Sequence, residues 1–158
     1  MTSLSLDEAI ARSSLFGDLD ARSRALLGRI MVERTARRGE ALVREGDRPH
    51  PYGDALFLVL EGQVEIVRKD RDEAGAGPLA LLGPGDFFGV VSLVDDGPRA
   101  ATCQMASHGR LGCLARRTLD ALAHSDLDVA VGVEHAIARQ IARDLRLFNE
   151  KLVRQVEG

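Results

Sequence analysis

The sequence predicts an α+β fold, in which an antiparallel β-roll or jelly roll of about eight strands lies between helices at the two ends of the chain. Three observations favour this fold. Helical periodicity fills residues 5–29. Short apolar runs separated by pairs of turn residues then follow as far as residue 115, which is typical of an antiparallel sandwich or barrel. Helical periodicity returns after that point and lasts to the C-terminus.

Two short helices are expected near the N-terminus. Residues 5–14 have the apolar spacing of an amphipathic helix. Residues 15–19, Leu-Phe-Gly-Asp-Leu, break that spacing. Asp20 can then cap a second helix that runs to about Arg29, because an aspartate side chain accepts hydrogen bonds from the free amides of a first helical turn.

Four apolar runs between turn residues are predicted strands, namely 41–44, 55–60, 63–68 and 79–82. The second run is continuously apolar, so we expect it to be buried on both faces. The third alternates polar and apolar residues, so one of its faces is expected to contact water. Gly62 lies between these two runs and is expected to make a tight hairpin, at a position that requires a positive φ.

The remaining part of the roll is less regular. Residues 70–78 are charged and rich in glycine, and we expect a flexible loop there. Strands 101–106 and 110–115 are expected to pair through a three-residue turn, which would place Cys103 opposite Cys113. Cβ atoms of such neighbours lie about 4.5–5.5 Å apart, longer than the roughly 3.8 Å of a disulfide. We therefore expect two buried free thiols, a redox pair being the alternative.

Two helices are predicted at the C-terminal end, over residues 116–124 and 127–156. The second would be about 45 Å long if unbroken. Five of its apolar residues recur at alternating spacings of three and four, which is a heptad seam: Ala138, Ile141, Leu145, Phe148 and Leu152. We expect its first half to cover the roll and the seam to form a homodimer, packing on its own domain alone being the alternative. Arg139 and Arg143 are expected on a solvated face, with contact to a ligand as the alternative.

The segment 83–102 carries the most chemical information. It contains Gly-Pro-Gly-Asp, then Phe-Phe-Gly, then Pro-Arg-Ala-Ala-Thr. Small residues let a backbone come close to a ligand, and a guanidinium group matches the oxygens of a phosphate. Arg99, the single arginine of the segment, is therefore the candidate anchor for a bound phosphate. The alternative is a surface ion pair of Arg99 with Asp86, Asp95 or Asp96.

This order of residues resembles the phosphate-binding cassette of cyclic-nucleotide-binding domains, as in Crp/Fnr-like regulators and protein kinase A regulatory subunits. The resemblance extends over residues 15–152. Together with the helical spacing, it divides the chain into an expected N-terminal helix at 1–14, a cyclic-nucleotide-binding-like roll at 15–126 and a lid or dimerisation helix at 127–158. It also implies cyclic AMP as the favoured ligand, because alanine follows the cassette arginine.

The resemblance further implies how the ligand is held. A short helical turn over residues 90–94 would direct its first amides at the phosphate, with the helix dipole behind them. The amides of Val91, Ser92 and Ala100 would join the Arg99 guanidinium in that role. The residues expected to line the site are Gly89, Val90, Val91, Ser92, Arg99, Ala100 and Ala101.

Val90 departs from the family's pattern. The family has a glutamate there, which accepts a hydrogen bond from the ribose 2′-hydroxyl. Its loss costs about 1.5–3 kcal/mol, or roughly ten- to hundredfold in affinity. Three outcomes are open: weaker cyclic-nucleotide binding, a different ligand, or an empty pocket. The missing carboxylate could also be supplied from elsewhere in the chain, by Asp54, Glu61 or Glu65.

The sequence thus predicts a non-enzymatic regulatory domain that binds a cyclic nucleotide and signals to an unidentified protein effector by moving its long helix. The alternative is a degenerate domain that acts as a dimerisation or interaction module, with no nucleotide or with a different one such as cyclic di-GMP. We expect no cofactor beyond the ligand, because no catalytic set is apparent. We expect no metal either, because the four histidines do not pair at ligand spacing: His50, His108, His124 and His135.

Composition excludes several other classes of protein. A net charge of −3 gives no basic field for nucleic acid, and the chain has no room for a recognition helix after residue 152, so we expect no DNA binding by this chain alone. No apolar run approaches the roughly 18 residues of a membrane span. The N-terminus lacks the basic start and apolar centre of a signal peptide, so a cytoplasmic location is expected.

Overall fold

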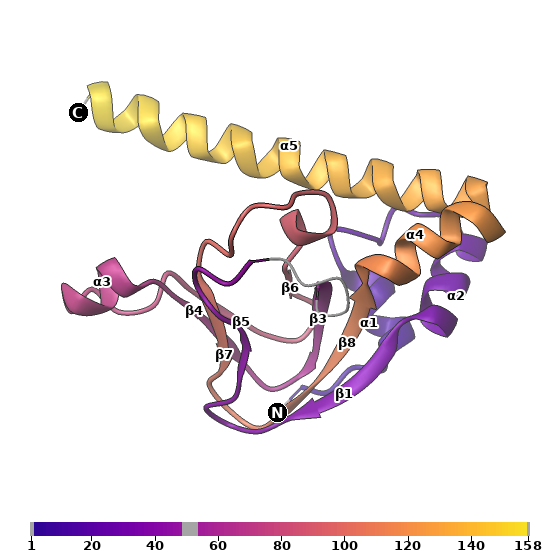
Figure 1. Cartoon of the computed structure of the whole chain (residues 1–158), viewed down its shortest axis with the longest axis horizontal. Helices are drawn as coiled ribbons and strands as arrows, with labels where there is room; N and C mark the ends of the chain where they lie inside the picture. Colours follow the sequence, from indigo (N-terminus) through magenta and orange to yellow (C-terminus); the bar gives the residue numbers. More distant parts are fainter. Residues whose placement is uncertain (1, 49–53, 158) are drawn as a thin grey trace.

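Two four-stranded antiparallel sheets form the body of the protein, and one long helix lies across its open side (Figure 1). The computed structural model describes residues 2–48 and 54–157. Its helices are α1 Leu6–Arg12, α2 Ala21–Ile30, α3 Lys69–Glu73, the 3-10 turn η1 Val91–Leu93, α4 Arg116–Ser125 and α5 Leu127–Glu157. Its strands are β1 Val32–Ala36, β2 Ala41–Val43, β3 Ala55–Glu61, β4 Val64–Val67, β5 Ala80–Leu82, β6 Phe87–Phe88, β7 Thr102–Met105 and β8 Gly109–Ala115. The predicted α+β roll is confirmed.

The strand order is β1-β8-β3-β6 in one sheet and β2-β7-β4-β5 in the other. Strands β1 and β6 lie outside the apolar runs seen in the sequence. The first has four exposed residues and the second is two residues long, so neither has a clear apolar pattern. Both lie at sheet edges, where a strand is buried on fewer sides.

Strand β3 is buried on both faces, as predicted, because each face has its own apolar partner. Leu56, Leu58 and Leu60 pack with the helices, in a cluster that includes residues of α1, α2, α4 and α5. Phe57 and Val59 point into the interior of the roll and pack with residues of both sheets. Each such side chain contributes about 2 kcal/mol of hydrophobic stabilisation. The alternating faces of β3 therefore join the helical layer to the roll.

Both predicted hairpins are wrong, although Gly62 has the predicted positive φ of 87°. β3 and β4 belong to different sheets, and so do β7 and β8, so each turn carries the chain from one sheet to the other. The two turns hold each other: the amide of Gln63 donates to Oγ of Ser107 at 2.9 Å. A corner turn and a hairpin turn have the same local residue pattern, so only closure of the roll distinguishes them.

The cysteines are consequently not cross-strand neighbours. Cys103 pairs with Val43 and Ile66, whereas Cys113 pairs with Val32 and Phe57 on the other sheet. Both are free thiols, as predicted, but only Cys103 is buried as expected, since Cys113 is half-buried.

The predicted loop at 70–78 is also wrong in part, because α3 occupies its first residues. The helix projects from the roll (Figure 1) and buries no residue. Its charged composition and the glycines after it give no apolar periodicity, which is the signal that the sequence analysis depends on. The first amide of α3, that of Lys69, donates to the carboxylate of Glu45 at 2.9 Å.

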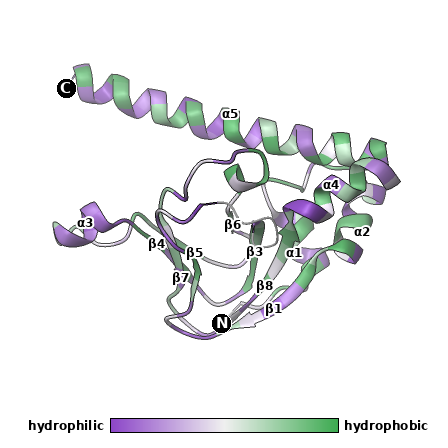
Figure 2. Cartoon of the chain, viewed as in Figure 1, coloured by the Kyte–Doolittle hydropathy of each residue, from purple (hydrophilic) through white to green (hydrophobic). Residues whose placement is uncertain are grey.

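The other helices follow their predictions closely. Asp20 caps α2, because its Oδ1 accepts the amide of Ser23 at 2.7 Å, and this hydrogen bond lowers the pKa of the Asp20 carboxyl. Val129, Val133 and Ile137 of α5 are buried against the helical layer. Residues 142–157 are exposed throughout and extend past the roll, with apolar stripes along them (Figure 2). None of the described helices combines the length and apolar character that a bilayer crossing requires.

Gly62→Ala is expected to destabilise the fold more than Gly75→Ala. Both glycines have positive φ, 87° and 69°, which costs a residue with a side chain about 1–2 kcal/mol. A Cβ at Gly62 would also lie 2.3 Å from the carbonyl oxygen of His108, whereas nothing lies within 4 Å at Gly75. Urea unfolding should show a loss of about 3 kcal/mol or more at Gly62 and about 1 kcal/mol at Gly75. Equal losses would contradict the packing of the two corner turns.

Candidate functional site

A cavity of about 350 Å³ lies between the sheets, the cassette and α5. Its lining comes from β2, β4, β6, β7, the segment 89–101 and α5. The structure brings all seven predicted site residues to this cavity: Gly89, Val90, Val91, Ser92, Arg99, Ala100 and Ala101. Their expected role in ligand binding remains a prediction.

The inner wall of the cavity is apolar. Val43, Ile66 and Cys103 come from three strands of one sheet, and Phe88 comes from the other. The ring of Phe88 stacks on Phe57, with centroids 4.9 Å apart, which fixes the wall in place. A ligand in this cavity therefore meets hydrocarbon over much of its surface. These residues could not be predicted from the sequence, because apolar residues in strands carry no signal that distinguishes a pocket wall from a core.

Gly89 sets the position of the cassette. It has a φ of 87°, and a Cβ there would lie 2.7 Å from the carbonyl oxygen of Ala55. The cassette can therefore pass close to the start of β3 only because residue 89 has no side chain. The predicted helical turn follows as η1, one turn of 3-10 helix.

Two of the three amides expected to face the ligand are free to do so. The amide of Ser92 donates to the carbonyl oxygen of Gly89 at 3.2 Å, so it is already used by the turn. The amides of Val91 and Ala100 make no hydrogen bond within the described part of the chain. Both residues are exposed, so either water or a ligand can accept from these two amides.

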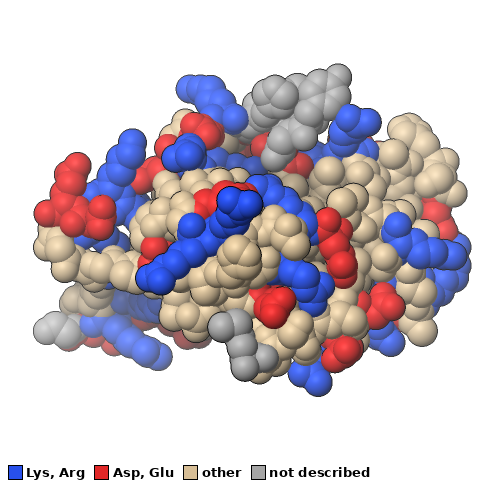
Figure 3. All heavy atoms as spheres, turned by 90° about the horizontal axis from the view of Figure 1, so that it is seen from below, with Lys and Arg blue, Asp and Glu red and all other residues tan. Residues whose placement is uncertain are grey.

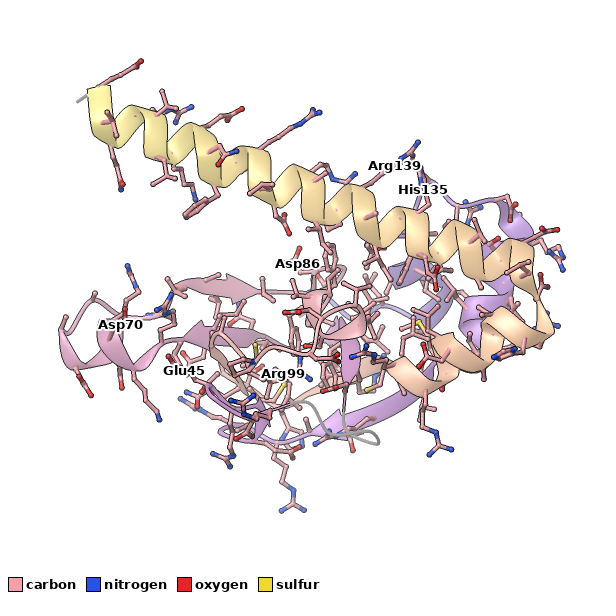
Figure 4. All side chains as sticks on the ribbon, turned by 45° about the horizontal axis from the view of Figure 1, so that its top comes forward. Glu45, Asp70, Asp86, Arg99, His135 and Arg139 are labelled. Atoms are coloured by element: carbon pink, nitrogen blue, oxygen red, sulfur yellow. The ribbon has the colours of Figure 1, made fainter. Side chains whose placement is uncertain are left out.

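Arg99 lies in the interior of the roll, below α5 (Figure 4). Its side chain is 12% exposed, and its Nη2 donates to Oδ1 of Asp54 at 3.2 Å. Asp54 is 7% exposed and directly precedes β3. A charge that loses its hydration needs a counter-charge, and Asp54 provides it. This is the one hydrogen bond of the Arg99 side chain among the described residues, so most of its N–H groups are available to a ligand.

The alternative of a surface ion pair between Arg99 and Asp86, Asp95 or Asp96 is therefore wrong. Asp96 pairs instead with Arg116 at 2.7 Å. Asp86 accepts the amide of Gly83 at 2.9 Å and so closes its own turn. The buried partner lies 45 residues away in the sequence, too far for local spacing to reveal it.

Of the three carboxylates considered as substitutes for the family's glutamate, only Asp54 reaches the cassette. Glu61 pairs with Arg110 at 3.3 Å, and Glu65 accepts from Gln104 at 2.6 Å. Asp54 contacts the guanidinium rather than the cavity itself, since it is absent from the lining. Val90 does line the cavity, but it is 7% exposed and packs in the cluster of the helical layer.

The lid contributes a carboxylate that the sequence analysis missed. Asp144 of α5 lines the cavity, and its Oδ1 accepts from Gln140 Nε2 at 2.9 Å. The Nη2 atom of Arg143 donates to Oε1 of the same Gln140 side chain and to the carbonyl oxygen of Ser14, the latter at 3.2 Å. Arg143 and Arg139 line a separate cavity beside the α1–α2 connection rather than this one, so the alternative that they contact the ligand is wrong.

The histidines and the surface charges of the described residues bear on the alternatives of a metal site and a basic surface. Among the described residues, no three His, Cys, Asp or Glu side chains are placed to hold a metal ion. His50 lies outside the described residues. The face shown in Figure 3 mixes Lys and Arg with Asp and Glu rather than presenting one basic field.

Comparisons with known proteins point to one family. The family model described as "Cyclic nucleotide-binding domain" matches residues 33–126. The chain is 29% identical over 147 residues to the CRP-like cAMP-activated global transcriptional regulator of Mycobacterium tuberculosis, which covers 93% of this chain and 62% of that protein. This chain thus spans about three fifths of the length of that relative.

Solved structures agree. The N-terminal domain of a transcriptional regulator from Streptomyces coelicolor is similar at 34% identity and a TM-score of 0.70, covering 91% of this chain and 94% of that one. The regulatory domain of Toxoplasma gondii PKA, crystallised with cAMP, is similar at 29% identity and a TM-score of 0.61, covering 74% of this chain and 42% of that one.

Cys103 offers a chemical probe of the cavity wall. Burial raises the pKa of its thiol from 9.0 to about 11, although the nearby Arg99 charge acts in the opposite direction. At any pH below both pKa values, the thiolate fraction of Cys103 is about a hundredfold lower than that of a thiol with a pKa of 9.0. Because the thiolate is the nucleophile, alkylation is slower by a similar factor. In Cys113→Ser protein, we expect iodoacetamide labelling at pH 8 to be slow and to accelerate as the pH approaches 11. Labelling at pH 8 as fast as in the urea-unfolded chain would contradict a closed, apolar wall.

Proposed function

This chain belongs to the cyclic nucleotide-binding domain family, and from that premise we propose that its cavity binds a cyclic nucleotide, with cyclic AMP favoured. The observation that carries the proposal is Arg99, an arginine 12% exposed at the wall of an apolar cavity. Such an arginine, beside the unbonded amides of Val91 and Ala100, suits a single anionic group with an apolar body. A cyclic nucleotide has that form.

Three features support cyclic AMP within that class. The mycobacterial relative is named as cAMP-activated, and the Toxoplasma domain was solved with cAMP. Ala100 follows the cassette arginine, as in the cyclic AMP type of the family. Asp144 brings a carboxylate to the cavity, and one of its oxygens is already bound by Gln140. The other oxygen can accept from one N–H group, such as the amino group of adenine, rather than from the two adjacent N–H groups of guanine.

The expected affinity is lower than that of a complete family site. Val90 cannot accept a hydrogen bond from the ribose, which costs roughly ten- to hundredfold. Asp54 also carries a negative charge next to Arg99 and so opposes the approach of a second anion. We therefore propose a sensor of weak affinity rather than a tight binder.

Movement of α5 is the proposed signal. The helix contributes Asp144 to the cavity, and its second half extends past the roll. A ligand shifts the position of α5 only if it interacts differently with two positions of the helix, and contact with Asp144 provides such a difference. The proposed output goes to a protein effector, and no catalytic role is proposed.

The seam of α5 supports a homodimer as part of the proposal. Leu145, Phe148 and Leu152 are 57%, 57% and 43% exposed, which is high for large apolar side chains on one helical stripe. Ala138 is exposed on the same stripe, whereas Ile141 is half-buried against the helical layer. A second copy of α5 would cover this stripe with knobs-into-holes packing.

A second function is favoured by the Arg99–Asp54 pair itself. Arg99 already has a buried counter-charge, and the apolar Val90 leaves the ribose position without an acceptor. In this second function, the chain is a dimerisation and interaction module. Its cavity binds no nucleotide, or binds a different one such as cyclic di-GMP.

Calorimetric titration separates the two functions. We expect the wild-type protein to bind cyclic AMP more tightly than cyclic GMP or cyclic di-GMP. Arg99→Ala should weaken binding at least about tenfold, since a charged hydrogen bond is lost, whereas the matched control Arg22→Ala, which removes an ion pair with Asp126 outside the cavity, should leave it unchanged. No heat from any of the three nucleotides would favour the second function.

Asp54→Asn is expected to raise the affinity for cyclic AMP. Asparagine retains an acceptor oxygen for Arg99 but removes the negative charge that opposes the phosphate. An increase of about three- to tenfold at low salt is expected in the same titration, shrinking as salt is added. A loss of affinity would show that Asp54 mainly orients Arg99.

Sedimentation velocity tests the dimer. Leu145→Glu with Phe148→Glu places charges in the seam and should give a monomer. Leu147→Glu is the matched control, since Leu147 is 56% exposed but lies about 200° round the helix from Leu145. A wild-type monomer at high protein concentration, or dissociation by the control, would contradict the seam.

A further inference from the structure

Helix α3 depends on a cap from outside its own segment. It has five residues and buries none of them. Its N-cap residue, Arg68, makes no side-chain hydrogen bond to the helix. The amide of Lys69 donates instead to Oε2 of Glu45 at 2.9 Å, across 24 residues of sequence. In the described part of the chain, this is the single hydrogen bond or ion pair between α3 and any residue outside its own β4–β5 connection.

An isolated helix of this length does not fold in water. Helices shorter than about 12–15 residues are marginal on their own, because nucleation fixes several residues for one hydrogen bond. With no buried side chain, α3 gains nothing from apolar packing. The carboxylate of Glu45 satisfies an unpaired first-turn amide and places negative charge at the positive end of the helix. The stability of α3 therefore depends on where Glu45 is held.

The cassette holds Glu45 in place. The amide of Glu45 donates to Oγ1 of Thr102 at 2.9 Å. The next two residues pair with the cassette arginine: Gly46 donates to the carbonyl oxygen of Arg99, and the amide of Arg99 donates to the carbonyl oxygen of Asp47, each at 2.8 Å. Figure 4 shows Glu45 beside the strands, between Arg99 and the projecting helix that carries Asp70. Glu45 thus touches the cassette with its main chain and α3 with its side chain.

We propose that Glu45 is a positioning residue that makes the folding of α3 depend on the cassette, so that α3 responds to occupancy of the cavity. A ligand held by Arg99 restrains the strand to which residues 45–47 are bonded. That restraint keeps the Glu45 carboxylate at the first turn of α3. The occupied cavity therefore orders a charged helix that has no buried residue, on the far side of the sheet. The ligand-dependent half of this inference rests on the proposed function.

NMR-detected hydrogen exchange on the full chain, without ligand, tests the tether. The reporters are the amides of Asp72, Gly75 and Ala76, which are hydrogen-bonded within α3 and the turn after it. Glu45→Ala should increase their exchange rates about fivefold, the effect of losing one helix cap. Glu45→Gln, which retains an acceptor oxygen but loses the charge, should increase the rates less than Glu45→Ala does.

Glu65→Ala is the matched control for the tether. Glu65 lines the same groove as Glu45 but accepts from Gln104 rather than from α3, so its loss should leave the three amides unchanged. Thr102→Val removes the acceptor for the Glu45 amide and should reproduce Glu45→Ala at α3, whereas Thr102→Ser should not. Identical exchange at α3 in wild type and Glu45→Ala would overturn the inference.

Saturating cyclic AMP tests the response to occupancy. In the wild-type complex, the exchange rates of the three amides should fall at least about threefold. This decrease should be absent in Glu45→Ala, in which the main-chain hydrogen bond of residue 45 to Thr102 is retained. An equal decrease in Glu45→Ala would overturn the coupling through Glu45. If cyclic AMP produces no heat with either protein, the proposed function fails and the ligand response fails with it, while the ligand-free comparison still decides the tether.

Discussion

The structure depends on one electrostatic constraint, which is that the guanidinium of Arg99 lies inside an apolar roll. Burying an unpaired charge is costly, and truncating one partner of a buried pair commonly costs about 3–5 kcal/mol. Asp54 meets that requirement within the chain at 3.2 Å. The phosphate of a cyclic nucleotide would meet it from outside. Arg99 is therefore neutralised by Asp54 in the ligand-free protein and would be neutralised by the phosphate in the proposed complex. The affinity for the ligand reflects the difference in free energy between these two arrangements.

The surrounding elements fix the backbone of the cassette around Arg99. Gly89 lets the cassette lie against the start of β3, and η1 leaves the amide of Val91 unbonded. The backbone of Arg99 is fixed by the turn at 46–47. The first half of α5 is fixed by apolar packing, whereas residues 145–157 are exposed throughout. A rigid cradle and a partly unsupported lid are the combination that a ligand-dependent helix movement requires.

Local sequence patterns predicted most of the helices and strands and the seven cassette residues of the cavity, but not β1, β6, α3 or the long-range pairings. The seven cassette residues lie together because they are neighbours in sequence, framed by glycines and an arginine that no strand pattern explains. Asp54, Asp144 and the apolar wall come from distant segments, so their contribution depends on closure of the roll. The two supposed hairpins failed for the same reason, since the turns at Gly62 and Ser107 look identical whether the chain reverses within a sheet or crosses to another. Helix α3 escaped prediction because Glu45, rather than its own residues, caps it.

A titration of isotope-labelled protein with cyclic AMP, followed by nitrogen–proton NMR, tests most directly whether Arg99 and the cassette amides form an anion site. The account predicts that the Nε–H signal of Arg99 and the amides of Val91 and Ala100 move first and furthest, because these groups would donate to the phosphate. Signals of the corner turns at Gly62 and Ser107 should stay in place. Saturable shifts confined to those other regions, with the Arg99 side-chain signal unmoved, would contradict it.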